Sequence, residues 1–284
     1  HRAKAVAVSQ IGYSLGGLLV PIVIVSLEMF GWRTTAFASG VIVMIVGLPL
    51  VQLVRHRPEP YGEHPDGVSA DDHDHHVQTR SAASRDFTAR EAMRTPAFWL
   101  ISLGHAMALL TVSAVMVHLI PHLTEDLDFT LSAAGGIVAL MTAFQLAGQI
   151  LGGYLGDRFN KRFICIGCMI AHAAGMLMLA FAASVPMVIG FAVLHGLGWG
   201  TRGPMMVALR ADYFGSTAFG TIMGFSSLIV MFGMAAGPIV AGYMADVSGN
   251  YESGFAVLAL GSLFGSIFFL TATPPSMPVR ATTS

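Results

Sequence analysis

The chain has 284 residues, of which 54% are hydrophobic and only 11% are charged, and its mean hydropathy is +0.68. Soluble proteins carry about 25% charged residues, and a soluble domain of this length exposes too much surface to hide so many apolar side chains. The formal net charge of −1 gives no sign of a nucleic-acid partner, and two cysteines cannot form a disulfide framework. We therefore expect the lipid bilayer to be the solvent of this protein.

Eight apolar segments are long enough to cross a bilayer as helices, which takes roughly 20 residues. They lie at 5–27, 34–54, 97–121, 131–155, 163–183, 187–209, 219–244 and 253–273. These segments are too long and too uniformly apolar for the alternating strands of a β-barrel. The expected fold class is an all-α polytopic membrane protein with eight transmembrane helices.

The first segment carries polar residues on one side, Gln10, Tyr13 and Ser14. Polar side chains inside a membrane span are costly and are functional candidates for that reason. Gln10 and Ser14 are therefore candidates for facing a substrate cavity. Gly12 and Gly16 of the same segment are predicted to pack against a neighbouring helix.

Residues 55–96 are rich in Pro, Gly, Ser, Asp, His and Arg, with few aliphatic residues. This composition predicts a polar loop between two spans within 1–54 and six spans within 97–273. Residues 274–284 follow as a tail.

The fourth segment contains Gln145 and Gln149, which lie four residues apart and so share one helix face. Gln145 stands near the expected midplane, where it would hydrogen-bond to a substrate. The alternative is that both amides hydrogen-bond to a neighbouring helix. Gly148 and Gly152 form an adjacent face of small residues suited to close packing.

The next turn reads GGYLGDRFNKR, residues 152–162, and concentrates four charges between two apolar runs. Its cations, Arg158, Lys161 and Arg162, are typical of a turn on the cytoplasmic side. Asp157 is expected either to pair with them or to cap the helix that follows.

The sixth segment holds the leading substrate candidate, Arg202, in the sequence GWGTRGP. It lies about 15 residues, or roughly 22 Å, from the outer end of its helix, which is still inside the hydrocarbon. A guanidinium that faces a cavity would bind a carboxylate through two parallel hydrogen bonds. The alternatives are that Arg202 extends to the cytoplasmic headgroups or satisfies carbonyls freed by Pro204.

His195, on the same helix as Arg202, is either a proton-coupling group or a partner in an interhelical hydrogen bond. His118 and His122 have the spacing of a metal pair but lie at the outer end of their helix, and we expect neither a metal site nor a cofactor. CIGC, residues 165–168, has redox-motif spacing but lies within a span, so packing is the expected role. No nucleophile–base cluster indicates an enzyme.

Charge placement predicts the orientation. All of the 15 Lys and Arg residues except Arg33 and Arg202 fall on one side of the eight segments. The turns on the other side carry acidic residues, namely Glu28, Glu125, Asp126, Asp128, Asp246 and Glu252. The positive-inside rule makes the basic side cytoplasmic. We expect both termini there, with the protein in the plasma membrane.

The sequence also contains an internal repeat. SLGGLLVPIVI, residues 14–24, aligns with MFGMAAGPIVA, residues 231–241, and each leads through a short turn to another span. The second copy belongs to the last two helices of a six-helix group. The first copy is expected to end such a group too, whose first four helices are not in this chain.

These motifs resemble those of major facilitator superfamily transporters. GGYLGDRFNKR resembles the signature between the second and third helices of each half, and GWRTTAF (31–37) resembles the corner between the fifth and sixth helices. RGPMMVALRADYFG (202–215), RPEPYGEHPDG (57–67) and RTPAFWLI (94–101) are similar to the monocarboxylate and oxalate/formate branch. The resemblance covers the chain as a fragment with helices five to twelve of twelve.

The resemblance implies a two-bundle carrier that exposes one central site alternately to either side of the membrane. It also implies that the 152–162 turn is a cytoplasmic latch between the bundles. The residues matching the signature are Gly152, Gly153, Gly156, Asp157, Arg158, Lys161 and Arg162. Proton-coupled monocarboxylate carriers have an Asp and an Arg where Gln145 and Gln149 stand here, so the resemblance does not extend to proton coupling through this helix.

The expected function is secondary active transport of small organic anions such as monocarboxylates, by symport or antiport with a proton or a counter-anion. The expected substrate-binding residues are Arg202, Gln145, Gln149, His195, Gln10 and Ser14. The alternatives are an exporter of a drug or a cation and a non-transporting membrane sensor. Arg202 lies deep within a span and no carboxylate clearly does, which favours anions over cations. The central loop is too polar for the folded domain that a sensor would need.

Overall fold

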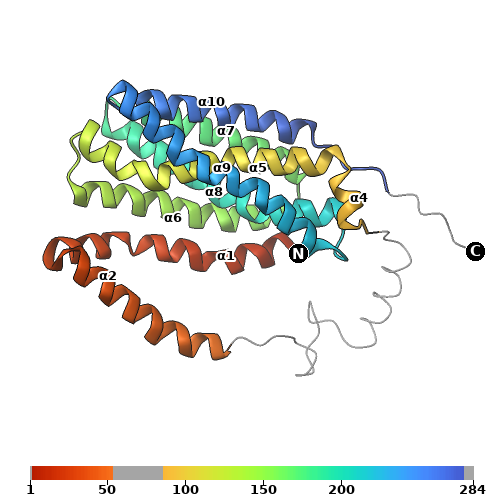
Figure 1. Ribbon diagram of the computed structural model, residues 1–284, viewed down its shortest axis with the longest axis horizontal. Helices are drawn as coiled ribbons and strands as arrows, with labels where there is room; N and C mark the ends of the chain where they lie inside the picture. The colour runs from red at the N-terminus through yellow and green to blue at the C-terminus, as the bar shows by residue number, and fades with distance from the viewer. Residues whose placement is uncertain (1, 54–85, 278–284) are drawn as a thin grey trace, which may run out of the picture. The chain divides into compact units, whose positions relative to one another are not determined.

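The computed structural model describes residues 2–53 and 86–277 (Figure 1). Its contacts divide the chain into two units, His1–Pro21 with Asp86–Ser284 and, separately, Ile22–Arg85. Most of the predicted polar loop and residues 278–284 of the tail lie outside the described residues. The predicted division of the chain into four parts therefore stays a prediction.

Every regular element within the described ranges is a helix, and the all-α fold predicted from the sequence is confirmed. The helices are α1 (Arg2–Leu18), α2 (Val20–Leu53), α4 (Ala89–Met93), α5 (Pro96–Pro121), the π-helical turn η3 (His122–Asp126), α6 (Leu131–Gly156), α7 (Lys161–Ala180), α8 (Val185–Phe214), α9 (Phe219–Ser248) and α10 (Glu252–Thr271).

Capping side chains fix where three long helices of the described chain begin. Thr95 accepts a hydrogen bond from the first turn of α5, and Pro96 follows, where a missing N–H costs nothing. Thr130 caps α6 and Asn160 caps α7 in the same way. Short polar residues before apolar runs thus set the helix boundaries.

Six stretches of the described residues are long and apolar enough to cross a membrane. The first, Gln10–Leu53, has 44 residues and reaches across the first two predicted spans. α8 is not among the six, although it has 30 residues, because Arg202, His195 and several glycines lower its hydropathy. Counting α8 and dividing the first stretch in two recovers the eight predicted spans.

The turn predicted between the first two spans is a bend within α2. Its residue Gly31 has φ 74° and ψ 166°, a backbone conformation that glycine adopts readily. Within Ile22–Arg85, the hydroxyl oxygens of Ser26 and Thr35 lie 2.9 Å apart across this bend. GWRTTAF therefore begins at the bend itself.

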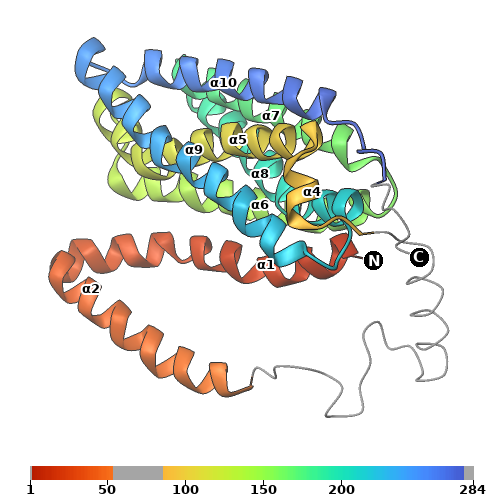
Figure 2. The same ribbon diagram turned by 45° about the vertical axis from the view of Figure 1, so that its right-hand side comes forward.

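The long helices α5 to α10 lie side by side in a bundle (Figures 1 and 2), and the pairs of helices in contact repeat. α6 packs against α8, and α5 packs against α9. α7 packs against α8 and α10, and α10 also packs against α5. Exchanging α5, α6 and α7 for α8, α9 and α10 leaves this set of pairs unchanged. The bundle is thus built from two three-helix repeats, an arrangement that membrane transporters use.

Glycines bring the paired helices together. A Cβ atom added at Gly148 or Gly152 of α6 would lie 2.6 Å from a carbonyl oxygen of α8. In α9, added Cβ atoms at Gly233 and Gly237 would collide with carbonyl oxygens of α5. The predicted packing role of Gly148 and Gly152 is confirmed, and the same four-residue spacing serves the second repeat.

α1 packs against α6 and α8. Its contact glycine is Gly17, where an added Cβ would collide with the side chain of Thr142. Gly12 and Gly16 have no atom within 4 Å of an added Cβ. Within the described part of the chain Gly12 and Gly16 therefore have no packing neighbour, and both line a cavity.

The segment before α4 is tied to the loop before α9. Although partial burial raises the pKa of Asp86, hydrogen bonds from Thr217 and Ser216 hold that pKa below its usual value of 3.8. The backbone N–H groups of Ser216 and Thr217 lie 2.7 and 2.8 Å from the carboxylate. This loop also contains Gly215, with φ 80°.

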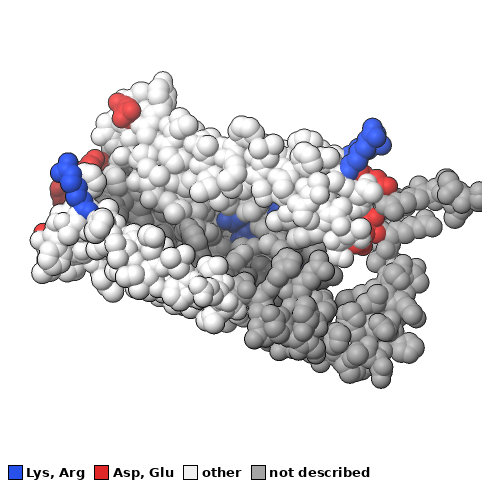
Figure 3. Space-filling view, turned by 60° about the horizontal axis from the view of Figure 1, so that its bottom comes forward, with Lys and Arg blue, Asp and Glu red and all other residues white. Residues whose placement is uncertain are grey.

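Large apolar side chains cover the outside of the helices. On α9, Phe232, Ile239 and Val247 are 72%, 69% and 71% exposed. The face shown in Figure 3 carries few charged residues between its ends. Water would not favour such a surface, whereas a lipid environment does. The helices are those of an integral membrane protein.

Candidate functional site

A cavity of about 450 Å³ lies within the unit that contains α1 and α5 to α10. Its lining includes Gln10 of α1, Gln145 and Gln149 of α6, and Arg202 of α8. Four of the six substrate-binding residues predicted from the sequence are therefore brought together. The volume is within the range of small-molecule sites, about 300–1,000 Å³. We call this space the polar cavity.

Arg202 is the buried cation of the polar cavity. Its side chain is 1% exposed, and its Nε and Nη1 atoms have no hydrogen-bond partner among the described residues. A buried guanidinium without partners is costly, so the cavity must supply them as water or as an anionic ligand. Its burial excludes the alternative in which Arg202 extends to the headgroups.

Two of the three glutamines that line the polar cavity are also buried. Gln145 is 2% exposed and Gln149 is 3% exposed, and Oε1 of Gln149 has no hydrogen-bond partner in the described part of the chain. The side chain of Gln10 lies against Gly203, where an added Cβ would collide with its amide oxygen. The Gln10 amide thus lies directly against α8 beside Arg202.

His105 of α5 lines the polar cavity and was not among the predicted site residues. Its Nδ1 atom lies 3.3 Å from Nη2 of Arg210. A guanidinium only donates, so this nitrogen must accept and the ring proton must be on Nε2. His105 is therefore a neutral imidazole with an N–H group to offer.

Arg210 is held by hydrogen bonds on every side. It is 2% exposed, and it donates to the Ser226 hydroxyl from Nε at 3.0 Å and from Nη2 at 2.7 Å. Nη1 donates to the carbonyl oxygen of Met206 at 2.9 Å. The charge-placement argument assigned Arg210 to the cytoplasmic surface, but the structure buries it. A single sequence gives no signal that Arg210 meets His105.

His195 does not line the polar cavity. Its Nδ1 atom lies 3.1 Å from Nδ1 of His172 on α7, and both rings are buried. This is the interhelical hydrogen bond that the sequence offered as the alternative to proton coupling. The Nε2 atoms of both rings have no hydrogen-bond partner within the residues described.

Ser14 is buried, and its hydroxyl has no hydrogen-bond partner among the side chains and backbone that the structure describes. It is absent from the lining of the polar cavity, whereas Gln10, one turn earlier on α1, is present. The predicted pair on α1 is therefore separated by the structure.

A second cavity of about 540 Å³ lies between α1, α5, α6 and α8. Its lining is made of glycines and aliphatic side chains, with Thr142, Gln145 and Trp199. The Thr142 hydroxyl donates to the carbonyl oxygen of Val138 at 2.8 Å, so its hydrogen is already engaged. We call this space the apolar cavity. Gln145 and Trp199 also line the polar cavity, so the two adjoin there.

The 152–162 turn joins α6 to α7. Lys161 pairs with Asp212 at the end of α8, with Nζ 2.6 Å from the carboxylate. The guanidinium of Arg158 stacks on the ring of Tyr154, 4.1 Å from its centroid. Asn160, not Asp157, caps α7, so the capping alternative for Asp157 is wrong. A latch between bundles stays a prediction.

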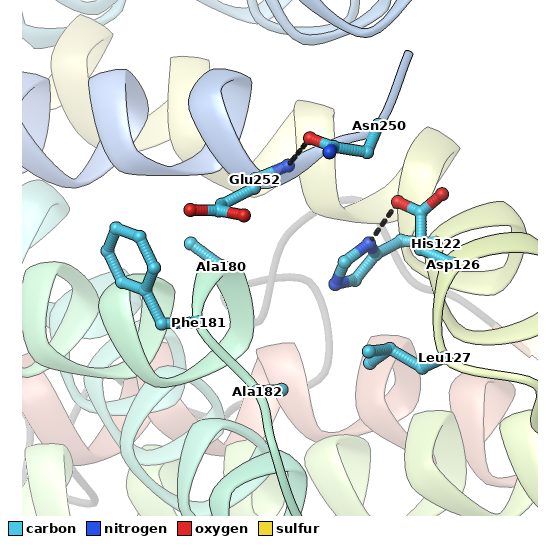
Figure 4. A pocket seen from close by; sticks show the side chains of 8 residues that line it. All are labelled: His122, Asp126, Leu127, Ala180, Phe181, Ala182, Asn250 and Glu252. Carbon is cyan, nitrogen blue, oxygen red and sulfur yellow. Dashed lines mark hydrogen bonds and ion pairs between the residues drawn. The ribbon is translucent and has the colours of Figure 1, made fainter. Parts of the chain in front are cut away.

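A third cavity, of about 430 Å³, lies where α5 and α7 end (Figure 4). His122 Nδ1 lies 2.7 Å from Asp126, and His122 Nε2 lies 3.2 Å from the carbonyl oxygen of Leu179. His118 is likewise bonded through both ring nitrogens, to Tyr251 and to the Pro238 carbonyl. Among the described residues no group of three or more His, Cys, Asp and Glu residues is suited to hold a metal ion.

The sequence matches the model of the Major Facilitator Superfamily over residues 1–119 and 101–283. A benzoate transport protein from Acinetobacter baylyi is 23% identical over 90% of this chain and 58% of its own length. Monocarboxylate transporter 12 from Rattus norvegicus is 22% identical over 94% of this chain and 59% of its own length. The chain thus spans somewhat less than two thirds of these two relatives.

The quinolone resistance protein NorA from Staphylococcus aureus is 30% identical over 60% of this chain and 43% of its own length. Among solved structures, the peptide transporter POT in complex with sulfate superposes with a TM-score of 0.55. That superposition covers 61% of this chain and 37% of the transporter, at 19% identity, and it concerns the fold alone.

Proposed function

Because this chain belongs to the Major Facilitator Superfamily, we propose that it is part of a secondary carrier of small organic anions and that Arg202 binds the substrate carboxylate. The observation that carries the proposal is the buried guanidinium of Arg202, whose Nε and Nη1 atoms lack partners beside a cavity. A carboxylate has two acceptor oxygens that match the planar guanidinium. No catalytic chemistry is needed for this role.

The remaining lining of the polar cavity supports an anion. His105 offers a neutral N–H group, and the amides of Gln145 and Gln149 offer further donors. Among the residues that the structure describes, no Asp or Glu lines the polar cavity. A cationic substrate would meet the guanidinium of Arg202 without a compensating carboxylate, so anions are favoured.

The relatives agree with this choice only in part. One is named for benzoate and another for monocarboxylates, whereas a third is named for quinolone resistance. The alternative function is therefore export of a drug. Drug export would need a site that tolerates varied and often cationic molecules. The buried positive charge of Arg202 disfavours the binding of cations.

We further propose that transport proceeds by alternating access between two bundles, with residues 1–54 belonging to the N-terminal one and 97–273 forming the C-terminal one. The positive-inside rule supports a plasma-membrane orientation with both termini in the cytoplasm. The 152–162 turn would then lie on the cytoplasmic side, where its charges suit a gating contact. The coupling ion is either a proton or a counter-anion.

The Arg202→Ala variant tests the anchor. A hydrogen bond to a charged group contributes about 1.5–3 kcal/mol, so benzoate is expected to bind roughly 10- to 100-fold more weakly. Uptake of labelled benzoate into proteoliposomes should fall accordingly. The midpoint of thermal unfolding of Arg202→Ala, measured beside that of the unsubstituted protein, controls for general loss of folding. Unchanged benzoate affinity in Arg202→Ala would sink the proposal.

A further inference from the structure

The apolar cavity differs from the polar cavity in the charge of its lining. No charged side chain of the described residues lines it, and among its polar lining groups the Thr142 hydroxyl already donates within α6. Its volume of about 540 Å³ exceeds the about 450 Å³ of the polar cavity. Water gains few hydrogen bonds in such a space, whereas an apolar ligand group is stabilised there by leaving water.

The two cavities adjoin at named side chains. Gln145 and Trp199 line both, so a ligand anchored at Arg202 has the apolar cavity next to it. Gln145 offers a flexible amide at this boundary, and Trp199 offers an aromatic surface. A single molecule with a charged end and an apolar body matches this pair of spaces.

The glycines of α1 leave room for that body. Gly12 and Gly16 both line the apolar cavity, and neither has an atom within 4 Å of an added Cβ. They differ from Gly17, which is needed for the contact with Thr142. The missing side chains at these two glycines therefore enlarge the cavity, and no contact within the described residues requires glycine there.

We propose that the substrate is a monocarboxylate with an extended apolar body, such as an aromatic ring or an aliphatic chain of several carbons. Its carboxylate binds Arg202 in the polar cavity, and its body occupies the apolar cavity past Gln145 and Trp199. This proposal rests on the anion-binding role of Arg202. The polar cavity recognises only the carboxylate, and this proposal specifies the chemistry of the rest of the substrate.

A homologous series of acids tests the proposal. Propionate, butyrate, pentanoate and hexanoate are added to the purified protein in detergent, and their dissociation constants are obtained from thermal stabilisation. Each buried methylene is expected to tighten binding about fourfold. Benzoate should bind more tightly than propionate. A series in which affinity does not rise with length would overturn the proposal.

Filling the apolar cavity provides the matched variant. Gly16→Leu places a side chain in open space on α1, so hexanoate and benzoate should lose about tenfold or more in affinity while propionate is unaffected. Gly136→Leu, at an exposed glycine of α6 that also has open space around it, is the control and should bind all acids normally. Equal affinities of Gly16→Leu and Gly136→Leu for hexanoate and benzoate would contradict the proposal that the apolar part of the substrate occupies the apolar cavity.

The two proposals fail in different ways. If Arg202→Ala abolishes binding of every acid but chain length has no effect, the carboxylate anchor stands and the apolar-body proposal falls. If the acids bind equally well to Arg202→Ala, the anion-carrier proposal falls, and the apolar-body proposal falls with it.

Discussion

Arg202 and Arg210 lie eight residues apart on α8 and are equally buried, yet their surroundings give them different roles. Arg210 donates to Ser226, Met206 and His105 and is fully engaged in holding helices together. Arg202 keeps two donor atoms without partners beside a cavity. Burial alone therefore does not identify a binding arginine, because what matters is whether its donors are already used.

The protonation of the His105 ring is set by its contact with Arg210. Because Arg210 donates to its Nδ1 atom, His105 presents Nε2–H and cannot take up a second proton without losing that contact. We therefore expect carboxylate binding to change little through His105 across the range in which free histidine titrates, about pH 5–8.

His105→Phe should lower carboxylate affinity about tenfold, because it keeps the ring but removes the donor to a charged group. His105→Gln should restore much of the loss, since an amide can accept from Arg210 and donate into the polar cavity. Dissociation constants for benzoate at several pH values check both expectations. A steep loss of binding in the wild-type protein between pH 6 and 8 that His105→Gln removes would contradict the neutral assignment.

At the scale of elements, the contact of α6 with α8 is made by backbone meeting backbone. An added Cβ at Gly200 would collide with the carbonyl oxygen of Gln145 and lie 2.9 Å from the backbone nitrogen of Gln149. No flexible side-chain end can move aside there. The same contact positions Gln145 and Gln149 beside Arg202, so helix packing and the polar cavity share one set of residues.

Gly200→Ala should therefore destabilise the protein. Overpacking against backbone costs about 1–3 kcal/mol, and at about 2–4 °C per kcal/mol the apparent Tm in detergent should fall by roughly 2–12 °C. Gly136→Ala is the control, because nothing lies within 4 Å of its added Cβ and alanine favours helix. Equal Tm values for the two variants would show that α6 and α8 do not pack this closely.

At the scale of the whole molecule, the orientation in the membrane is set by the ends of the helices. The turn from α6 to α7 carries Arg158 and Lys161, whereas the far end of α9 carries Asp246. The energy of moving several cations across a bilayer makes one orientation strongly preferred. The native Cys165 and Cys168 are 0% and 5% exposed and leave little background for thiol labelling.

Two cysteine variants test this orientation. In intact cells a membrane-impermeant maleimide should label Asp246→Cys, while Arg158→Cys should be labelled only after permeabilisation. The unsubstituted protein, with its two buried thiols, is the control. The opposite pattern of labelling would invert the proposed topology.

Much of the fold could be predicted from the sequence because membrane spans leave a strong local signal. Continuous apolar runs, the residues that cap helices and the asymmetry of Lys and Arg are all read along the chain. The sequence also indicated Arg202, Gln145, Gln149 and Gln10, because polar groups in a span are rare and costly. His195 met the same criterion, but the structure bonds it to His172 outside the polar cavity.

The sequence by itself thus determined the helical class, the membrane environment and the glycine spacing of α6, since each depends on residues that are close together in the chain. Only the tertiary structure decided which polar residues share a cavity, how Arg210 orients His105, and where the apolar cavity adjoins the polar one. Those outcomes depend on contacts between different helices. A local pattern carries no information about which faces of distant helices meet, because packing across the bundle chooses them.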